Sequence, residues 1–123
     1  MKYLGVDYGT KKIGLAMSEG TLPYPFKSVD TKQAVTEISR IVVQEKIDIL
    51  VIGQPALKIK PAFDKFVNEL KINLTSKIII WDETLTSQKA RTYLLDRNKK
   101  QRQQKEHAVS ASLILEDYLT RID

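Results

Sequence analysis

The chain contains no cysteine, so it has neither a disulfide framework nor a thiolate metal site. Long apolar runs are also missing, because none reaches the length of a membrane span and no secretory hydrophobic region follows the first residue. These absences predict a reduced, cytoplasmic protein that has no membrane partner. With 123 residues, the chain is expected to form one domain, residues 1–123, which has room for a real core but not for two substantial lobes.

Positive charge is in excess, with 20 Lys+Arg against 15 Asp+Glu and a net charge of +5. Such an excess favours polyanionic partners. The basic residues concentrate in "RNKKQRQQK", residues 97–105, a run that contains Lys99, Lys100 and Arg102 and that no acid interrupts. A solvated linker and a nucleic-acid-binding segment both fit this run.

Apolar patterning predicts five strands, at residues 2–8, 12–18, 24–29, 48–53 and 77–83. The first two fit an antiparallel hairpin, whereas 48–53 and 77–83 are continuous apolar runs typical of buried strands. Helices are expected from a cap at Thr31 to near Lys46, around Phe63 to Leu74, from Thr86 or Ser87 to about Leu95, and over 106–119. This order predicts an α/β fold whose mixed five-stranded sheet has three antiparallel strands and then two parallel ones, flanked by helices.

The second strand and the last helix each carry a distinctive face. Gly14, Ala16 and Ser18 alternate with large apolar residues, so one face of the second strand is small and lets another element pack closely. The last helix is expected to bury the apolar positions Ala108, Ala111, Leu115, Tyr118 and Leu119.

Acidic residues end two of the predicted strands: Asp7 ends the first, and Asp82 and Glu83 end "KIIIW". Ligands collect beyond the carboxyl ends of strands in such sheets, and two carboxylates brought together there repel unless a proton or a cation separates them. Magnesium suits these oxygen ligands, because it is usually held by one or two carboxylates and substrate phosphates. Side chains alternate along a strand, so Asp82 and Glu83 are expected to point to opposite sides of the sheet. Asp7 and Asp82 have an alternative role, because an aspartate at such a position also caps a turn or a helix. Glu83 has no such alternative role, which favours it as the second ligand.

His107 is the single histidine of the sequence and falls in the first turn of the predicted last helix. It shares a helical arc with Ala111 and Ile114, so it is expected to face the protein. A lone histidine in such a place is commonly a structural donor, but an imidazole also binds metals and moves protons near neutral pH. Because His107 follows the basic run directly, the run is expected to hold a phosphate backbone while His107 meets the scissile group.

The turn of the first hairpin consists of Gly9, Thr10, Lys11 and Lys12. The glycine lets the backbone approach a phosphate oxygen closely, and the two lysines add positive charge. Ordinary hairpins also close with such residues. The position directly after Asp7 favours a nucleic-acid contact.

Four motifs stand in order along the chain: "LGVDYGTKKIGLAMS", "ILVIGQP", "DETLTS" and "SASLILEDYL". Together they resemble the YqgF (RuvX-type) family, bacterial Holliday junction resolvase-like proteins that are also assigned as nucleases processing precursor ribosomal RNA. The resemblance covers essentially the whole chain and implies a ribonuclease H-like fold. It also implies hydrolysis of phosphodiester bonds with Mg²⁺ or Mn²⁺, in 5′-end processing of precursor 16S ribosomal RNA or at a four-way DNA junction.

Position by position, the resemblance makes Asp7 the first metal-binding carboxylate and Glu83 the second. The family usually has an aspartate where His107 stands, whereas related RuvC-type resolvases use a histidine in the last helix. His107 is therefore either a substitute ligand or proton carrier, or a mark of weakened catalysis. Thr84 replaces the usual arginine, and the loop after Gly53 lacks the usual Asn and Gly and looks shortened.

Three other functions compete with a nuclease. An actin-like sugar or acyl kinase also binds phosphate through an Asp-x-Gly-Thr turn, but it needs a second lobe for which this chain has no room. A non-catalytic module would bind nucleic acid through Lys11, Lys12 and residues 97–105, with a strong salt dependence. A protein-interaction scaffold leaves the acids at two strand ends unexplained. For a junction substrate, a homodimer would match the two-fold symmetry.

Overall fold

The computed structural model describes residues 1–82 and 99–121, and it describes the side chains of these residues except those of Asp82 and 99–106. The predicted strand end at Glu83 and the predicted helix at 86–95 lie outside the described residues.

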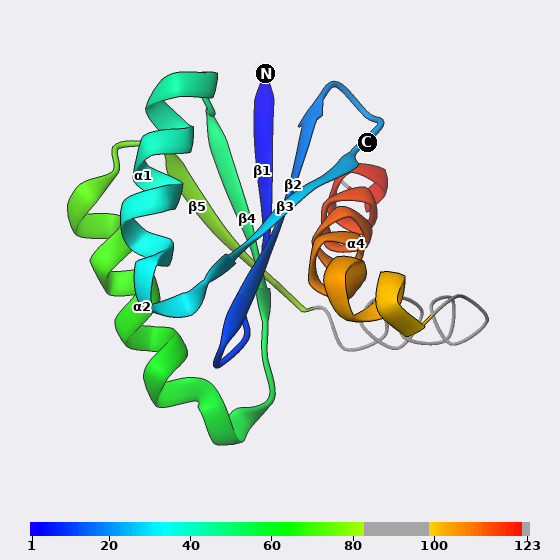
Figure 1. Ribbon diagram of the computed structural model, residues 1–123. Coiled ribbons are helices and arrows are strands. Elements are labelled where there is room, and N and C mark those ends of the chain that lie inside the picture. The colour runs from blue at the N-terminus through cyan, green and yellow to red at the C-terminus, as the bar shows by residue number, and fades with distance from the viewer. Residues whose placement is uncertain (83–98, 122–123) are drawn as a thin grey trace.

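Five strands form one mixed sheet (Figure 1). They are β1 (Lys2–Asp7), β2 (Lys12–Glu19), β3 (Tyr24–Asp30), β4 (Ile49–Gln54) and β5 (Lys77–Asp82), in the order β3-β2-β1-β4-β5. The pairs β1–β2 and β2–β3 are antiparallel, whereas β4 is parallel to both β1 and β5. The predicted arrangement of three antiparallel and two parallel strands is therefore confirmed.

Strand β5 differs from the prediction, which made it a buried strand. It lies at the edge of the sheet and pairs with β4 alone. Ile80 is 41% exposed as a result. A continuous apolar run does not distinguish an edge strand from a central one, because strand order is decided by long-range pairing.

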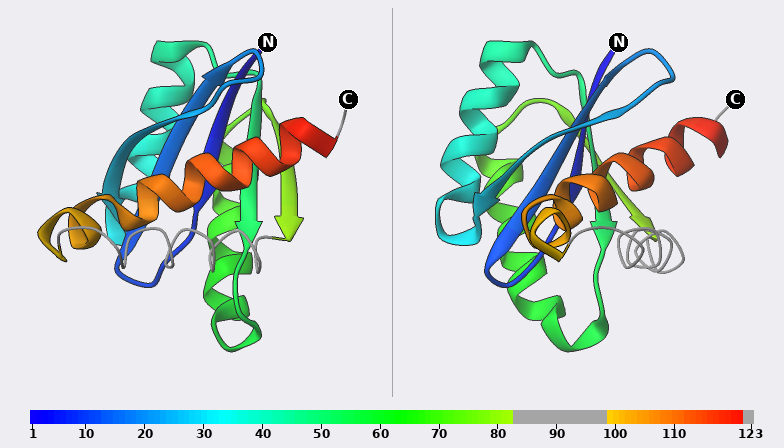
Figure 2. Two further views of the ribbon diagram at one scale, coloured as in Figure 1. Left: turned by 90° about the vertical axis from the view of Figure 1, so that its right-hand side faces the viewer. Right: turned by 45° about the vertical axis from the view of Figure 1, so that its right-hand side comes forward.

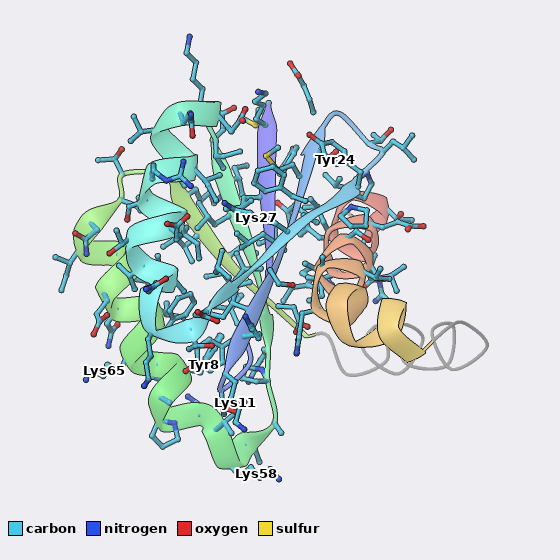
Figure 3. All side chains as sticks on the ribbon, viewed as in Figure 1. Tyr8, Lys11, Tyr24, Lys27, Lys58 and Lys65 are labelled. Atoms are coloured by element: carbon cyan, nitrogen blue, oxygen red, sulfur yellow. The ribbon has the colours of Figure 1, made fainter. Side chains whose placement is uncertain are left out.

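Helices cover both faces of the sheet. On one face lie α1 (Ala34–Glu45) and α2 (Lys60–Asn73), each preceded by a short 3₁₀ turn, η1 (Thr31–Gln33) and η2 (Leu57–Ile59). On the other face α4 (Lys99–Arg121) runs across the strands (Figure 2). Lys27 of β3, labelled in Figure 3, forms an ion pair with Glu37 of α1 (3.6 Å) and so joins α1 to the sheet. A hydrogen bond from Arg40 lowers the pKa of the Glu37 carboxyl. None of the described helices is long and apolar enough to cross a membrane.

The start of α1 departs from the predicted cap. Thr31 begins η1, and its hydroxyl donates to the Gly9 carbonyl (2.7 Å) instead of capping the helix. Helix α1 ends at Glu45, close to the predicted end near Lys46, and Lys46 follows it as the C-cap in the left-handed conformation (φ 57°). Thr31 therefore serves a long-range contact that local sequence patterns do not reveal.

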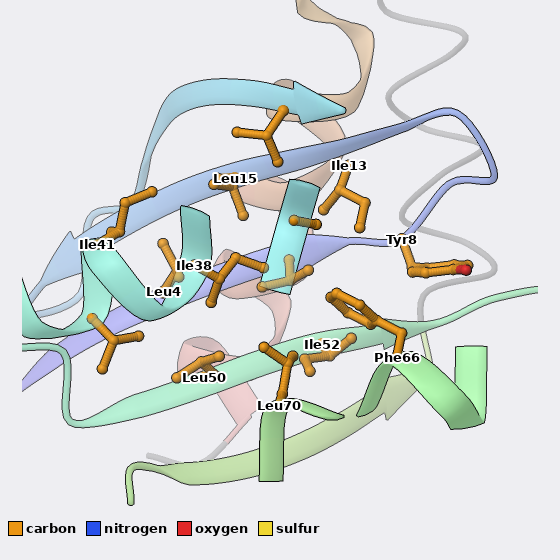
Figure 4. Packing of buried hydrophobic residues seen from close by; sticks show 14 of the residues in the cluster. Leu4, Tyr8, Ile13, Leu15, Ile38, Ile41, Leu50, Ile52, Phe66 and Leu70 are labelled. Carbon is orange, nitrogen blue, oxygen red and sulfur yellow. The ribbon is translucent and has the colours of Figure 1, made fainter. Parts of the chain in front are cut away.

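The larger core lies between the sheet and the pair α1 and α2 (Figure 4). Its fully buried side chains include Leu4, Ile13, Leu15, Ile38, Leu50, Ile52 and Leu70. A smaller cluster lies under α4 and contains Val51, Ile114, Leu115 and Tyr118. The sheet is therefore covered on both faces. This explains why β4 is a continuous apolar run from Ile49 to Ile52 and does not alternate with polar residues.

Helix α4 is longer than predicted, because it begins at Lys99 and includes most of the basic run. The linker interpretation of residues 97–105 is therefore wrong from Lys99 onward. The predicted inward face is confirmed, since all five of its residues are buried. The small face of β2 is confirmed as well: a Cβ added at Gly14 would overlap the backbone carbonyl of His107, so the helix backbone lies directly on the strand.

Candidate active site

Asp7 stands at the carboxyl end of β1, near the middle of the sheet, and is only 7% exposed. Its register partners are Gly14 on β2 and Gly53 on β4. Neither glycine carries a side chain, so no side chain stands beside the Asp7 carboxylate at the directly opposite positions of β2 and β4. We call this set of three paired positions the Asp7 row. The backbone of α4 covers Gly14 on the β2 side, whereas Gly53 on the β4 side leaves the Asp7 row without a side chain.

His107 of α4 lies against Asp7, as the sequence predicted that it would face the protein. Its Nδ1 is 3.3 Å from Oδ2 of Asp7, and its side chain is 39% exposed whereas that of Asp7 is 10% exposed. It lies about two helical turns from the first residue of α4, and not in the first turn as predicted. The fold thus joins the two residues across a hundred positions of sequence.

The Asp7 carboxylate has few partners in the described part of the protein. His107 is the one partner that the described residues offer it, and 3.3 Å is long for a hydrogen bond to an ionised group. A buried carboxylate in this state is costly unless a cation or a proton compensates for it. One carboxylate with an adjacent imidazole fits a divalent ion that takes its remaining ligands from water and substrate phosphates. Among the described residues, no group of three acidic or histidine side chains forms a complete site.

A second set of contacts holds α4, and with it His107, in place. The Trp81 indole N–H donates to the Asp117 carboxylate (2.7 Å), and the Trp81 ring meets Tyr118 edge-on at 5.3 Å. Tyr3 packs on Tyr118 from β1, and burial, with a smaller contribution from Tyr3, raises the pKa of the Tyr118 phenol. Asp117 was not predicted as a site residue, because the sequence around an acid on a terminal helix gives no sign of its distant partner.

The turn predicted to bind nucleic acid lies beside this site. Gly9 is close to His107, since a Cβ added at Gly9 would lie 3.4 Å from Cε1 of the imidazole. Thr10 and Lys11 are exposed. Lys12 forms an ion pair with Asp30 (2.7 Å), so its charge is partly compensated.

The described residues show no contact between Asp7 and the remaining predicted site residues. Glu83 lies outside the described residues. Asp82 pairs in register with Gln54, one residue beyond the row of Asp7 and Gly53. Lys99, Lys100 and Arg102 belong to the first turns of α4, and their side chains are not described.

Comparison with known proteins points to the same family that the sequence motifs resemble. The profile of the family RuvX, described as Holliday junction resolvase, matches residues 1–121. A protein of Halalkalibacterium halodurans named "Putative pre-16S rRNA nuclease" is 32% identical over 98% of this chain and 97% of its own length.

Two solved structures share the fold. The complex of Fowlpox virus resolvase with substrate Holliday junction DNA aligns with a TM-score of 0.70 and 13% identity, covering 99% of each chain. The Thermus thermophilus RuvC complex with a Holliday junction substrate aligns with a TM-score of 0.67 and 9% identity, covering 99% of this chain and 96% of RuvC. The expected ribonuclease H-like fold of the resolvases is therefore confirmed.

Proposed function

The chain belongs to the RuvX family of Holliday junction resolvases, and we propose that it is a metal-dependent nuclease that hydrolyses phosphodiester bonds in structured nucleic acid. The observation that carries this proposal is the buried Asp7 carboxylate, which lies at the carboxyl end of a central strand between two glycines and beside His107. The family match over residues 1–121 favours a nuclease over a kinase-like function.

Asp7 and Glu83 are the residues that would hold Mg²⁺ or Mn²⁺. The choice of Glu83 comes from the motif "DETLTS", which resembles the corresponding motif of the family. When bound, the ion supplies positive charge for the phosphate oxygens and for the attacking water. The Asp7 carboxylate is suited to this task because burial between glycines keeps it from other protein donors in the described chain.

The other residues at this end of the sheet would position the substrate. Gly9 and Thr10 let a phosphate approach the backbone of the turn, and Lys11 and Lys12 add charge there. Lys99, Lys100 and Arg102 would contact the phosphate backbone from the start of α4. His107 lies within reach of a group bound at Asp7, so its imidazole would hold or move a proton during cleavage or bind the metal.

Precursor 16S ribosomal RNA is the substrate that we favour, with cleavage in 5′-end processing. The support is the name of the relative from Halalkalibacterium halodurans, which matches this chain over nearly its whole length. A four-way DNA junction is the second candidate, favoured by the description of the family. A homodimer would suit that second substrate, because two active sites would then face two symmetric strands.

Cleavage assays on both labelled substrates test this function. With Mg²⁺ or Mn²⁺, the protein is expected to cut precursor 16S ribosomal RNA near the mature 5′ end and to lose this activity when the metal is chelated with EDTA. Cleavage of the junction alone would replace the RNA assignment with the second candidate. Binding of both substrates without cleavage under any metal condition would contradict the nuclease and favour a binding module.

Replacement of His107 is expected to reduce the rate of cleavage about a hundredfold, because a positioned acid or base contributes on the order of 10²–10⁴-fold. His107→Ala removes the imidazole, whereas His107→Gln keeps a hydrogen-bonding side chain that does not titrate. The measurement is the single-turnover rate between pH 5.5 and 8.5. We expect the pH dependence to change in both variants, while a purely structural histidine would leave the profile of His107→Gln unaltered. A faster His107→Asp enzyme would identify the histidine as a handicap.

A further inference from the structure

A second groove lies between α1 and α2, on the face of the sheet opposite α4. We call it the lysine groove, and its polar and aromatic lining consists of Tyr8, Thr31, Lys32, Thr36, Lys65, Phe66 and Glu69. It opens at the carboxyl ends of the strands, since Tyr8 directly follows the last residue of β1. The groove and the Asp7 site thus lie on opposite faces of the sheet at the same end.

The lysines of this region lack acidic partners. Lys11, Lys32, Lys58 and Lys65 are all exposed, and none forms an ion pair within the described chain. Figure 3 shows Lys11, Lys58 and Lys65 around Tyr8 at one end of the molecule. Other lysines nearby are compensated, as Lys12 is by Asp30 and Lys60 by Asp64. Among the described residues that line the groove, Glu69 is the one acid, so the groove keeps a positive excess.

Tyr8 adds a hydrogen-bond donor to this charge. Its ring packs on Phe63, with centroids 5.5 Å apart, and on Phe66, with centroids 5.0 Å apart. Figure 4 shows Tyr8 next to Phe66. Burial raises the pKa of the Tyr8 phenol, so the hydroxyl keeps its proton at neutral pH. The described chain offers this hydroxyl no hydrogen-bond partner, and the group is not among the fully enclosed unpartnered atoms. An acceptor from outside the protein is therefore the natural partner for the hydroxyl.

The groove is connected rigidly to the turn beside Asp7. The Thr31 N–H donates to the Lys11 carbonyl (2.9 Å), and the Thr31 hydroxyl donates to the Gly9 carbonyl (2.7 Å). These bonds fix Lys32 of η1 relative to the turn that carries Lys11. A ligand that passes from Asp7 over this turn would therefore meet Lys11 and then Lys32.

We propose that the lysine groove binds the phosphate backbone of a second segment of the nucleic-acid substrate, which passes from Asp7 around the turn at residues 9–12 to the other face of the sheet. The proposal rests on the proposed function for the identity of the substrate. Lysine ammonium groups and a protonated phenol all donate to phosphate oxygens, and they contact the backbone without reading sequence. The groove therefore extends the binding site beyond the point of cleavage.

Binding of RNA without metal tests this proposal. The probe is a fluorescein-labelled RNA hairpin with a single-stranded extension of twenty nucleotides, titrated in EDTA at several salt concentrations and followed by anisotropy. The double variant Lys32→Gln/Lys65→Gln is expected to bind about tenfold more weakly at low salt. The slope of log affinity against log salt is expected to fall by roughly 1.4, or about 0.7 for each lost phosphate contact.

The matched control is Lys46→Gln/Lys77→Gln, which removes the same charge from two exposed lysines at the other end of the strands. We expect the control to bind within twofold of the wild-type protein. Equal losses in both double variants, or no loss in either, would overturn the proposal. A changed sedimentation coefficient with unchanged RNA affinity would also overturn it and would assign the groove to self-association.

These results are separable from failure of the proposed function. Loss of affinity in the groove variant supports the lysine groove even if no substrate is ever cut, because the assay requires no catalysis. Cleavage of RNA by wild type, with equal affinities of the variants, would leave the nuclease intact and remove the lysine groove.

Discussion

Asp7→Asn is expected to reduce the rate of cleavage roughly a thousandfold, on whichever nucleic-acid substrate the protein is found to cut. The amide has nearly the shape of the carboxylate but is neutral, so it binds a divalent ion far more weakly. A metal ion supplies several kcal/mol of stabilisation to the reaction, and each 1.36 kcal/mol is about tenfold in rate. The measurement is the single-turnover rate with saturating Mg²⁺ or Mn²⁺.

The stability of Asp7→Asn separates a functional role from a structural one. Because the carboxylate is buried and its one contact in the described chain is long, neutralising it is expected to leave the melting temperature unchanged or to raise it. Asp64→Asn, on the exposed surface of α2, is the control and should cut at the wild-type rate. A stable Asp7→Asn protein that cuts as fast as wild type would exclude Asp7 as a metal ligand.

Gly14→Ala is expected to destabilise the fold and to abolish the alignment of His107 with Asp7. A Cβ at position 14 would overlap the backbone carbonyl of His107, which is not the flexible end of a side chain and cannot move aside alone. Overpacking of this kind costs about 1–3 kcal/mol, and more when backbone must shift. We expect the melting temperature to fall by about 10 °C and cleavage to fall with it.

Two comparisons sharpen this prediction. Gly5→Ala places its Cβ 2.7 Å from the Ala111 carbonyl, so it is expected to loosen α4 in the same way. Gly20→Ala has open space around its Cβ and pays only for its left-handed backbone (φ 105°), so it should cost about 1 kcal/mol and preserve activity. Equal stability of Gly14→Ala and Gly20→Ala in thermal unfolding would contradict the close packing of α4 on β2.

Much of the fold followed from local patterns in the sequence. The alternation of Gly14, Ala16 and Ser18 predicted a close contact, and the periodicity of the last helix predicted which face it buries. Both patterns arise from steric fit and burial, which are properties of neighbouring residues. The cap at Thr31 and the burial of β5 were predicted less well, because each depends on a partner far away in sequence.

The candidate site, too, was predictable in part from the sequence. The amino-acid pattern alone places Asp7 at the end of an apolar strand, next to a basic turn that contains a glycine, and an acid in such a place needs a compensating partner. The partner itself could be identified only once the chain was folded. Strand register placed Gly14 and Gly53 on either side of Asp7, and the contact of α4 with β2 brought His107 within 3.3 Å. The sequence gives the type of each residue, but the neighbours of Asp7 depend on how α4, about a hundred residues later in the chain, packs on the sheet.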